Sequence, residues 1–225
     1  YGPSQIFSDS LTLPPFWSEG GSSAYLLGTD DLGRDVLSRL IHGARVSLFV
    51  GVSIVLISTI IGTSLGLIAG YFGGKVDSVI MRFIDILMAY PSILLAIIVV
   101  SVIGPGMTNA IIAVAIVNIP SFTRLVRANV LEVKKRQFVM AAKTFGASPI
   151  RIMLKEILPN CMATLIVQTT LGLSEGILST AALGFLGLGV QPPTPEWGIM
   201  LSDARAYIES SPWLVTLPGL CILAV

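Results

Sequence analysis

The chain has 225 residues, of which 53% are hydrophobic and 12% are charged, and its mean hydropathy is +0.84. Because roughly 25% of residues in soluble domains are charged, this composition indicates a membrane protein and excludes an ordinary soluble domain. The net charge is only +1, and a nucleic-acid site needs Lys and Arg clustered on a soluble face without long apolar runs beside it. We therefore expect no nucleic-acid partner.

The first segment, residues 1–45, is polar at its start and has no apolar run that could form a signal-peptide core. We expect this segment to face outward. Apolar residues recur on one side of Asp31–His42, which predicts an amphipathic surface helix that Thr29 or Asp30 would cap. The transmembrane domain is expected over residues 46–225.

Five windows with few charges follow, and a helix needs about 20 apolar residues to cross a bilayer. The second window contains Arg82 and Asp85, which we expect to form a local ion pair. The fold class is therefore predicted to be all-α, a polytopic transmembrane helical bundle with five visible spans, the last truncated, and six in the parent chain. The windows cover residues 46–74, 79–103, 104–123, 160–188 and 212–225.

The distribution of basic residues predicts the orientation, because Lys and Arg in short loops flank the cytoplasmic side. The loop of residues 124–158 is therefore expected to be cytoplasmic and the acidic loop of residues 189–211 to face outward. Trp197 and Trp213 are expected to be interfacial anchors. The eight basic residues of the loop are Arg124, Arg127, Lys134, Lys135, Arg136, Lys143, Arg151 and Lys155.

Small residues recur at intervals of four within two of the predicted spans, as Gly62, Gly66 and Gly70 and as Gly172 and Gly176. Such spacing places them on one face of a helix, where another helix can approach closely. Packing within the chain is the favoured interpretation, and contact with a partner subunit is the alternative.

The basic loop is patterned as two helices. Gln137–Phe145 forms the first, a break follows at Gly146, and Pro149–Leu158 forms the second. Ser148 is placed to cap the second helix and Pro149 to occupy its first position. The pattern predicts a helix-turn-helix finger on which another protein docks.

This finger resembles the coupling loop of importer permeases of the ATP-binding-cassette (ABC) superfamily. Two departures are Met140, where the family pattern has Glu, and the missing spacer within Ile157-Leu158-Pro159. The resemblance implies an ATPase-coupling interface. Its residues are Met140, Ala141, Ala142, Lys143, Phe145, Gly146, Ser148, Pro149, Leu158 and Pro159.

Two further stretches, residues 27–39 and 182–198, resemble the C-type subunit of the dipeptide/oligopeptide/nickel permease family, closest to dipeptide permeases. The resemblance implies a non-catalytic, multi-pass subunit of the bacterial inner membrane that forms a heterodimer with a homologous B-type permease. Two ABC ATPase subunits and an outer-side solute-binding protein would complete the importer. Dipeptides or short peptides are the expected cargo, with nickel or oligopeptides as alternatives.

Glu175 is an acid in the fourth predicted span, where a charge costs roughly 2.5–3.5 kcal/mol on insertion scales. It is either a translocation-path residue that touches a peptide ammonium or a hydrogen-bonded structural acid. Pro91 and Pro120 lie within spans and each removes a backbone donor, so a kink is expected at each. Glu175, Pro120 and Pro91 are the candidate pathway residues.

The sequence contains no phosphate-binding loop of the type G-x-x-x-x-G-K-[ST]. We therefore expect the chain to bind no cofactor, with ATP and Mg²⁺ handled by partner subunits, and we find no pattern for a metal or a catalytic site. An ion-coupled secondary transporter is the alternative from another class. That class predicts paired internal repeats and several intramembrane charges. The sequence shows no repeat and only one deep acid.

Overall fold

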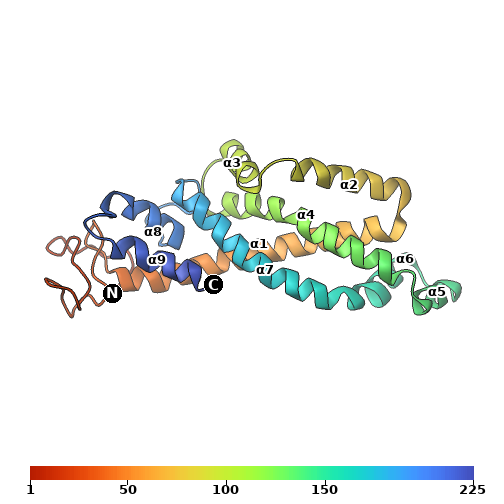
Figure 1. The fold of residues 1–225 in the computed structure, drawn as a ribbon, viewed down its shortest axis with the longest axis horizontal. Helices are drawn as coiled ribbons and strands as arrows, with labels where there is room; N and C mark the ends of the chain where they lie inside the picture. The colour runs from red at the N-terminus through yellow and green to blue at the C-terminus, as the bar shows by residue number, and fades with distance from the viewer. The chain divides into compact units, whose positions relative to one another are not determined.

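The computed structural model describes all 225 residues as a helical chain without strands, apart from an isolated bridge between Thr29 and Asp35 (Figure 1). The predicted all-α class is thereby confirmed. The helices are α1 (Val36–Phe72), α2 (Gly74–Met88), α3 (Ser92–Ile103), α4 (Met107–Val133), α5 (Gln137–Thr144), α6 (Pro149–Arg151), a π-helix (Ile152–Ile157), α7 (Leu158–Phe185), α8 (Trp197–Ala204), a 3₁₀ turn (Arg205–Tyr207) and α9 (Trp213–Leu223).

The chain forms two compact units. The first combines residues 1–52, 97–112 and 174–225, and the second combines residues 53–96 and 113–173. The first unit therefore holds the segments predicted to face outward, and the second holds the predicted cytoplasmic loop.

Two helices, α1 and α4, are long and apolar enough to cross a membrane by themselves. Helices α2 and α3 qualify only as a pair, and the pair is bent by 91° at the break. The second predicted span is therefore broken at Pro91, where a kink was expected, and the break is larger than a kink within one helix. The break lies at Pro91, which has no backbone N–H and disfavours helical geometry at Tyr90.

The two remaining predicted spans form α7 and α9, and neither of these helices meets both the length and the hydropathy of a membrane span. Helix α7 has 28 residues, among them the polar Gln168 and Glu175, and α9 has 11. By length and composition the structure contains two spans, or three with the bent pair, against five predicted.

The separate surface helix predicted over Asp31–His42 is wrong, because α1 begins at Val36 and runs without a break for 37 residues. Its cap is Asp35, whose Oδ2 accepts a hydrogen bond from the Ser38 N–H at 2.9 Å. Asp30 does not cap the helix because its carboxylate already accepts from the N–H groups of Leu32 and Arg34, at 3.0 and 2.8 Å.

In the second unit, α1 packs closely against α4 through the predicted glycine stripe. A Cβ added at Gly62 would lie 2.5 Å from Phe122 Cβ, one at Gly66 would lie 2.8 Å from Val126 Cβ, and one at Gly70 would lie 2.7 Å from Val130 Cβ. These distances leave no space for a side chain. At these three glycines the backbone of α1 therefore lies directly against α4.

In the first unit, α8 and α9 lie side by side (Figure 1) and pack with the first turns of α1. Trp197 at the start of α8 is 5% exposed, and its indole N–H donates to the Leu40 carbonyl at 3.1 Å. The prediction of Trp197 as an interfacial anchor is therefore wrong, because the ring belongs to the protein core.

Candidate functional site

Helix α5 forms the first half of the predicted finger and ends in a glycine turn. The Gly146 N–H donates to Lys143 O at 3.0 Å and the Ala147 N–H to Ala142 O at 3.1 Å. This pair of bonds requires a left-handed residue after the helix, and Gly146 supplies it with φ of +78°. The break that the sequence placed at Gly146 is confirmed.

The second half of the finger also begins as predicted, with Pro149 in the first turn and the Ser148 hydroxyl accepting from the Arg151 N–H at 3.4 Å. It does not stop before Pro159, however. Residues Ile152–Ile157 form a π-helix that leads directly into α7, so the prediction of a separate second helix is wrong. Pro159 has no N–H, so a regular α-helix would also lack a backbone hydrogen bond at this point. A wider π-helical turn before Pro159 therefore sacrifices fewer hydrogen bonds than it would elsewhere in a helix.

The finger is attached to the second unit by a shared hydrophobic core. Val139 of α5 and Ile152 of the π-helix are 4% and 1% exposed, and both belong to the core cluster that contains Val130 and Val133 of α4. Ala142 packs against the same cluster. The finger therefore moves with the ends of α4 and α7 and not as a loose loop.

The opposite side of the finger carries large apolar side chains that nothing in the chain covers. Phe145 is 90% exposed, whereas Ala142 packs against the core. Exposed apolar side chains in such density are typical of protein-protein contacts. We call this surface the finger face. It consists of Phe138, Phe145, Ile150 and Leu154.

Ion pairs within the second unit connect α4 to α2. The Arg124 guanidinium lies 2.6 Å from the Asp85 carboxylate, so the predicted local pair between Arg82 and Asp85 is wrong. Arg127 makes a bidentate contact with Asp77. Part of the basic cluster that predicted the orientation therefore also pairs with acids of α2.

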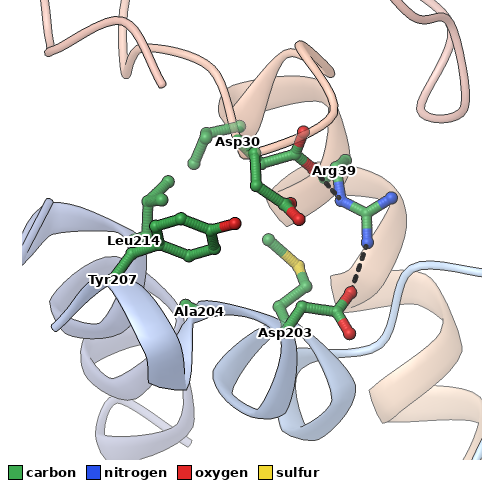
Figure 2. Close-up of a pocket in the computed structure, with 9 residues that line it drawn as sticks. Asp30, Arg39, Asp203, Ala204, Tyr207 and Leu214 are labelled. Carbon is green, nitrogen blue, oxygen red and sulfur yellow. Dashed lines mark ion pairs between the residues drawn. The ribbon is translucent and has the colours of Figure 1, made fainter. Parts of the chain in front are cut away.

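In the first unit, two buried arginines hold the segment before α1 to the end of α8. Arg39 lies 3.5 Å from Asp30 and 3.8 Å from Asp203, as Figure 2 shows. Arg34 is 2.6 Å from Asp30 and 3.7 Å from Asp203. Burial raises the pKa of Asp203, against the lowering effect of Arg39 and Arg34.

The cavity beside this cluster has a volume of about 20 Å³ and is also lined by Tyr207 and Leu214 (Figure 2). A cavity of that size holds about one water molecule. It is too small for a peptide, so the arrangement connects elements of the first unit and is not a binding site for cargo.

Glu196 is a buried acid that was not among the predicted site residues. It is 1% exposed, caps α8 by accepting from the N–H groups of Gly198 and Ile199 at 2.9 and 3.0 Å, and lies 3.2 Å from the Ser47 hydroxyl of α1. Burial raises its pKa, and these hydrogen bonds partly oppose the rise. The available signal was an acidic residue directly before the apolar stretch that starts at Trp197, a position typical of a helix cap.

Comparison with known proteins identifies the family. Residues 62–225 match the family described as the binding-protein-dependent transport system inner membrane component. The chain belongs to this permease family. It is a membrane-embedded subunit of the ABC importer type, as the sequence resemblance implied.

Named relatives of this permease are similar over almost its whole length. The dipeptide transport system permease protein DppC of Haemophilus influenzae is 54% identical over 225 residues, which cover 100% of this chain and 76% of the relative. The di/tripeptide transport system permease protein DppC of Pseudomonas aeruginosa is 56% identical and covers 99% and 74%. The glutathione transport system permease protein GsiD of Pectobacterium atrosepticum is 46% identical and covers 91% and 68%.

The fold of the permease is also found in a solved transporter. A chain of the inward-facing MetNI methionine ABC transporter superposes with a TM-score of 0.70 over 84% of this chain and 89% of that chain. The sequences are 20% identical, so the likeness establishes the shared fold. It supports the helical bundle predicted from the sequence.

Two of the candidate pathway residues of the permease lie in helices, and the third lies at a break between helices. Glu175 lies on α7 in the first unit, is exposed, and has no hydrogen bond or ion pair within the chain. Pro120 is buried inside α4, which continues through it, and Pro91 lies at the bend between α2 and α3. Among the small residues, Gly172 contacts Phe122, since an added Cβ would lie 3.3 Å from its ring, and Gly176 is buried.

Proposed function

We propose that this permease is the C-type subunit of a bacterial inner-membrane ABC importer that carries dipeptides or short peptides. The observation that carries the proposal is the finger face, a set of uncovered apolar side chains on an element anchored in the core. An ATPase subunit would bind there. Closure of two ATPases would then push the fingers of a permease heterodimer together and shift the bundle between inward- and outward-facing states.

The cargo assignment is supported by the names of the relatives. Dipeptide and di/tripeptide permeases are 54% and 56% identical to this chain, and a glutathione permease is 46% identical. All three names denote short peptides. An outer-side solute-binding protein would deliver the peptide, while ATP and Mg²⁺ would be bound by the ATPases and not by this non-catalytic chain.

Phe145→Ser tests the proposed ATPase contact. The side chain is 90% exposed and makes no contribution to the core, so the subunit should fold and insert normally. Loss of an aromatic interface anchor costs about 2 kcal/mol or more, which predicts about a 30-fold weaker association with the ATPases. Co-purification of the assembled importer with tagged permease measures it.

Phe16→Ser is the control, because Phe16 is also an exposed phenylalanine, with 54% of its surface accessible, and lies in the segment before α1. It should leave ATPase co-purification unchanged. Gly146→Arg should also prevent attachment, but the φ of +78° at Gly146 means that it strains the turn as well. Normal ATPase co-purification with Phe145→Ser would contradict the docking proposal.

Uptake assays with the assembled importer test the cargo. Radiolabelled dipeptide should be transported and competed by unlabelled di- and tripeptides. Nickel uptake without peptide uptake would favour the nickel alternative, and transport of only longer peptides would favour the oligopeptide alternative.

A further inference from the structure

A second feature of the finger lies on the side that faces the end of α1. Between α1, the end of α4 and α5 there is an open cavity of about 560 Å³, a volume within the range of roughly 300–1,000 Å³ that small-molecule sites occupy. We call it the lysine pocket. It is lined by Tyr71, Phe72, Lys134, Lys135, Val139, Met140, Lys143 and Ile152.

The charges of the lysine pocket are all of one sign. Three lysines line it and no acid does. The nearest acid in sequence, Glu132, is paired with Arg136 at 2.9 Å and does not line the pocket. The ammonium of Lys134 donates one hydrogen bond to Gly70 O at 2.6 Å, which leaves two further donors. The pocket therefore suits an anion.

The floor and one wall of the pocket are apolar. Val139 and Ile152 are 4% and 1% exposed and form the floor as part of the core. Tyr71 and Phe72 lie edge to face with ring centroids 5.2 Å apart. A ligand that fits this lining has an anionic group and an apolar part.

The pocket lies at the end of a helix that is able to cross a membrane. Helix α1 is one of the two helices that are long and apolar enough to cross a bilayer, and it ends at Phe72. Aromatic side chains and lysines gather at the ends of such spans, at the level of the lipid headgroups. Phe72 is 54% exposed, with one side of its ring against Tyr71.

We infer that the lysine pocket binds the headgroup of an anionic phospholipid, with its phosphate against Lys134, Lys135 and Lys143 and its glycerol and upper acyl chains against Phe72. Basic pockets between membrane helices recognise acidic lipids in this way. The bound lipid would lie between the end of α1 and the base of the finger.

Native mass spectrometry of the assembled importer in detergent, titrated with phosphatidylglycerol or phosphatidylcholine, tests the inference. Phosphatidylglycerol should be retained in preference to phosphatidylcholine. A lysine near the surface contributes about fivefold to binding of an acidic lipid. Lys135→Gln should therefore weaken retention about fivefold, and Lys135→Gln/Lys143→Gln about 25-fold. Lys135→Arg, which keeps the charge, should retain the lipid.

Arg151→Gln/Lys155→Gln is the matched control, because it removes two charges from the same loop at exposed positions outside the pocket. It should leave retention of phosphatidylglycerol unchanged. An equal loss in this control would mean diffuse attraction and would overturn the inference. So would equal retention of the two lipids, or loss of ATPase co-purification by Lys135→Gln with lipid retention intact, which would assign the pocket to the ATPase.

Discussion

At the scale of single residues, Glu196 shows how a buried acid connects helices without a cation. Its carboxylate accepts from two N–H groups of α8 and lies beside the Ser47 hydroxyl of α1. Gly184 of α7 is the third neighbour, since a Cβ there would lie 2.8 Å from Glu196 Oε2. One side chain therefore joins α1, α7 and α8 within the first unit.

The raised pKa of Glu196 predicts a pH dependence of stability. Burial raises the folded-state pKa above the ordinary value of 4.5, so the folded state holds the proton more tightly than the unfolded state. The resulting contribution is fully present below the unfolded pKa and is lost as pH rises through the folded pKa. The apparent melting temperature in detergent should therefore fall from about pH 4.5 upward, and Glu196→Gln should reduce that slope.

The raised pKa of Asp203 makes the melting temperature fall with rising pH in the same way. The contribution of Glu196 is therefore the difference between the pH slopes of wild type and Glu196→Gln. Identical slopes for the two proteins between pH 4.5 and pH 8 would show that Glu196 does not titrate in this range, because Gln cannot titrate.

Residue-level predictions from sequence succeeded where the determining contact is local. Ser148 and Pro149 start a helix as predicted because a cap and a first-turn proline act over three residues. Asp85 and Trp197 were wrongly assigned because their partners, Arg124 and the Leu40 carbonyl, are distant in sequence. Sequence spacing does not encode such partners.

At the scale of elements, the contact of α1 with α4 depends on the absence of side chains at three glycines. Gly66→Ala would place a Cβ 2.7 Å from Thr123 O and 2.8 Å from Val126 Cβ. The two helices would have to separate, which costs about 1–3 kcal/mol of stability. We expect a lower apparent melting temperature of the detergent-solubilised permease.

Gly219→Ala serves as the control for this substitution. Gly219 lies in α9, and no atom is within 4 Å of an added Cβ. Because Ala favours helix over Gly by about 1 kcal/mol, this variant should be as stable as wild type or slightly more stable. Equal effects of the two substitutions would contradict close packing at Gly66.

Helix positions were largely predictable from apolar runs, while helix continuity was not. The windows predicted α1, α4 and α7, and the pattern of the loop predicted α5. The extension of α1 to Val36 was missed because a polar face near Arg34 and Arg39 was interpreted as solvated, whereas both arginines are buried among carboxylates. The extent of the bend at Pro91 was missed because a proline permits either a kink or a break.

At the scale of the whole molecule, the position of Glu175 bears on transport. Its side chain is exposed on α7 and unpaired within the chain, which leaves it available to a pathway or to a partner permease. Glu175→Gln should lower peptide uptake about tenfold or more, as loss of a hydrogen bond to a charged group of 1.5–3 kcal/mol implies. Uptake into proteoliposomes measures this, with ATPase activity and assembly checked in parallel.

Glu209→Gln provides the same chemical change at an exposed position in the predicted outward loop. Uptake by this variant should equal that of wild type. If Glu175→Gln transports as well as Glu209→Gln, Glu175 has no pathway role, and pairing with a partner subunit becomes its remaining explanation.

The π-helix before Pro159 has a consequence for register. In its wider turn the Leu158 N–H bonds to Met153 O, five residues back, so the turn accommodates one residue more than an α-helix would. Every side chain of the finger is thereby rotated by about 100° relative to α7, compared with an uninterrupted helix. Removal of one residue from Ile152–Ile157 would restore a regular helix and turn Ile150 and Phe145 toward a different direction, so the length of this turn sets the direction in which the finger face points.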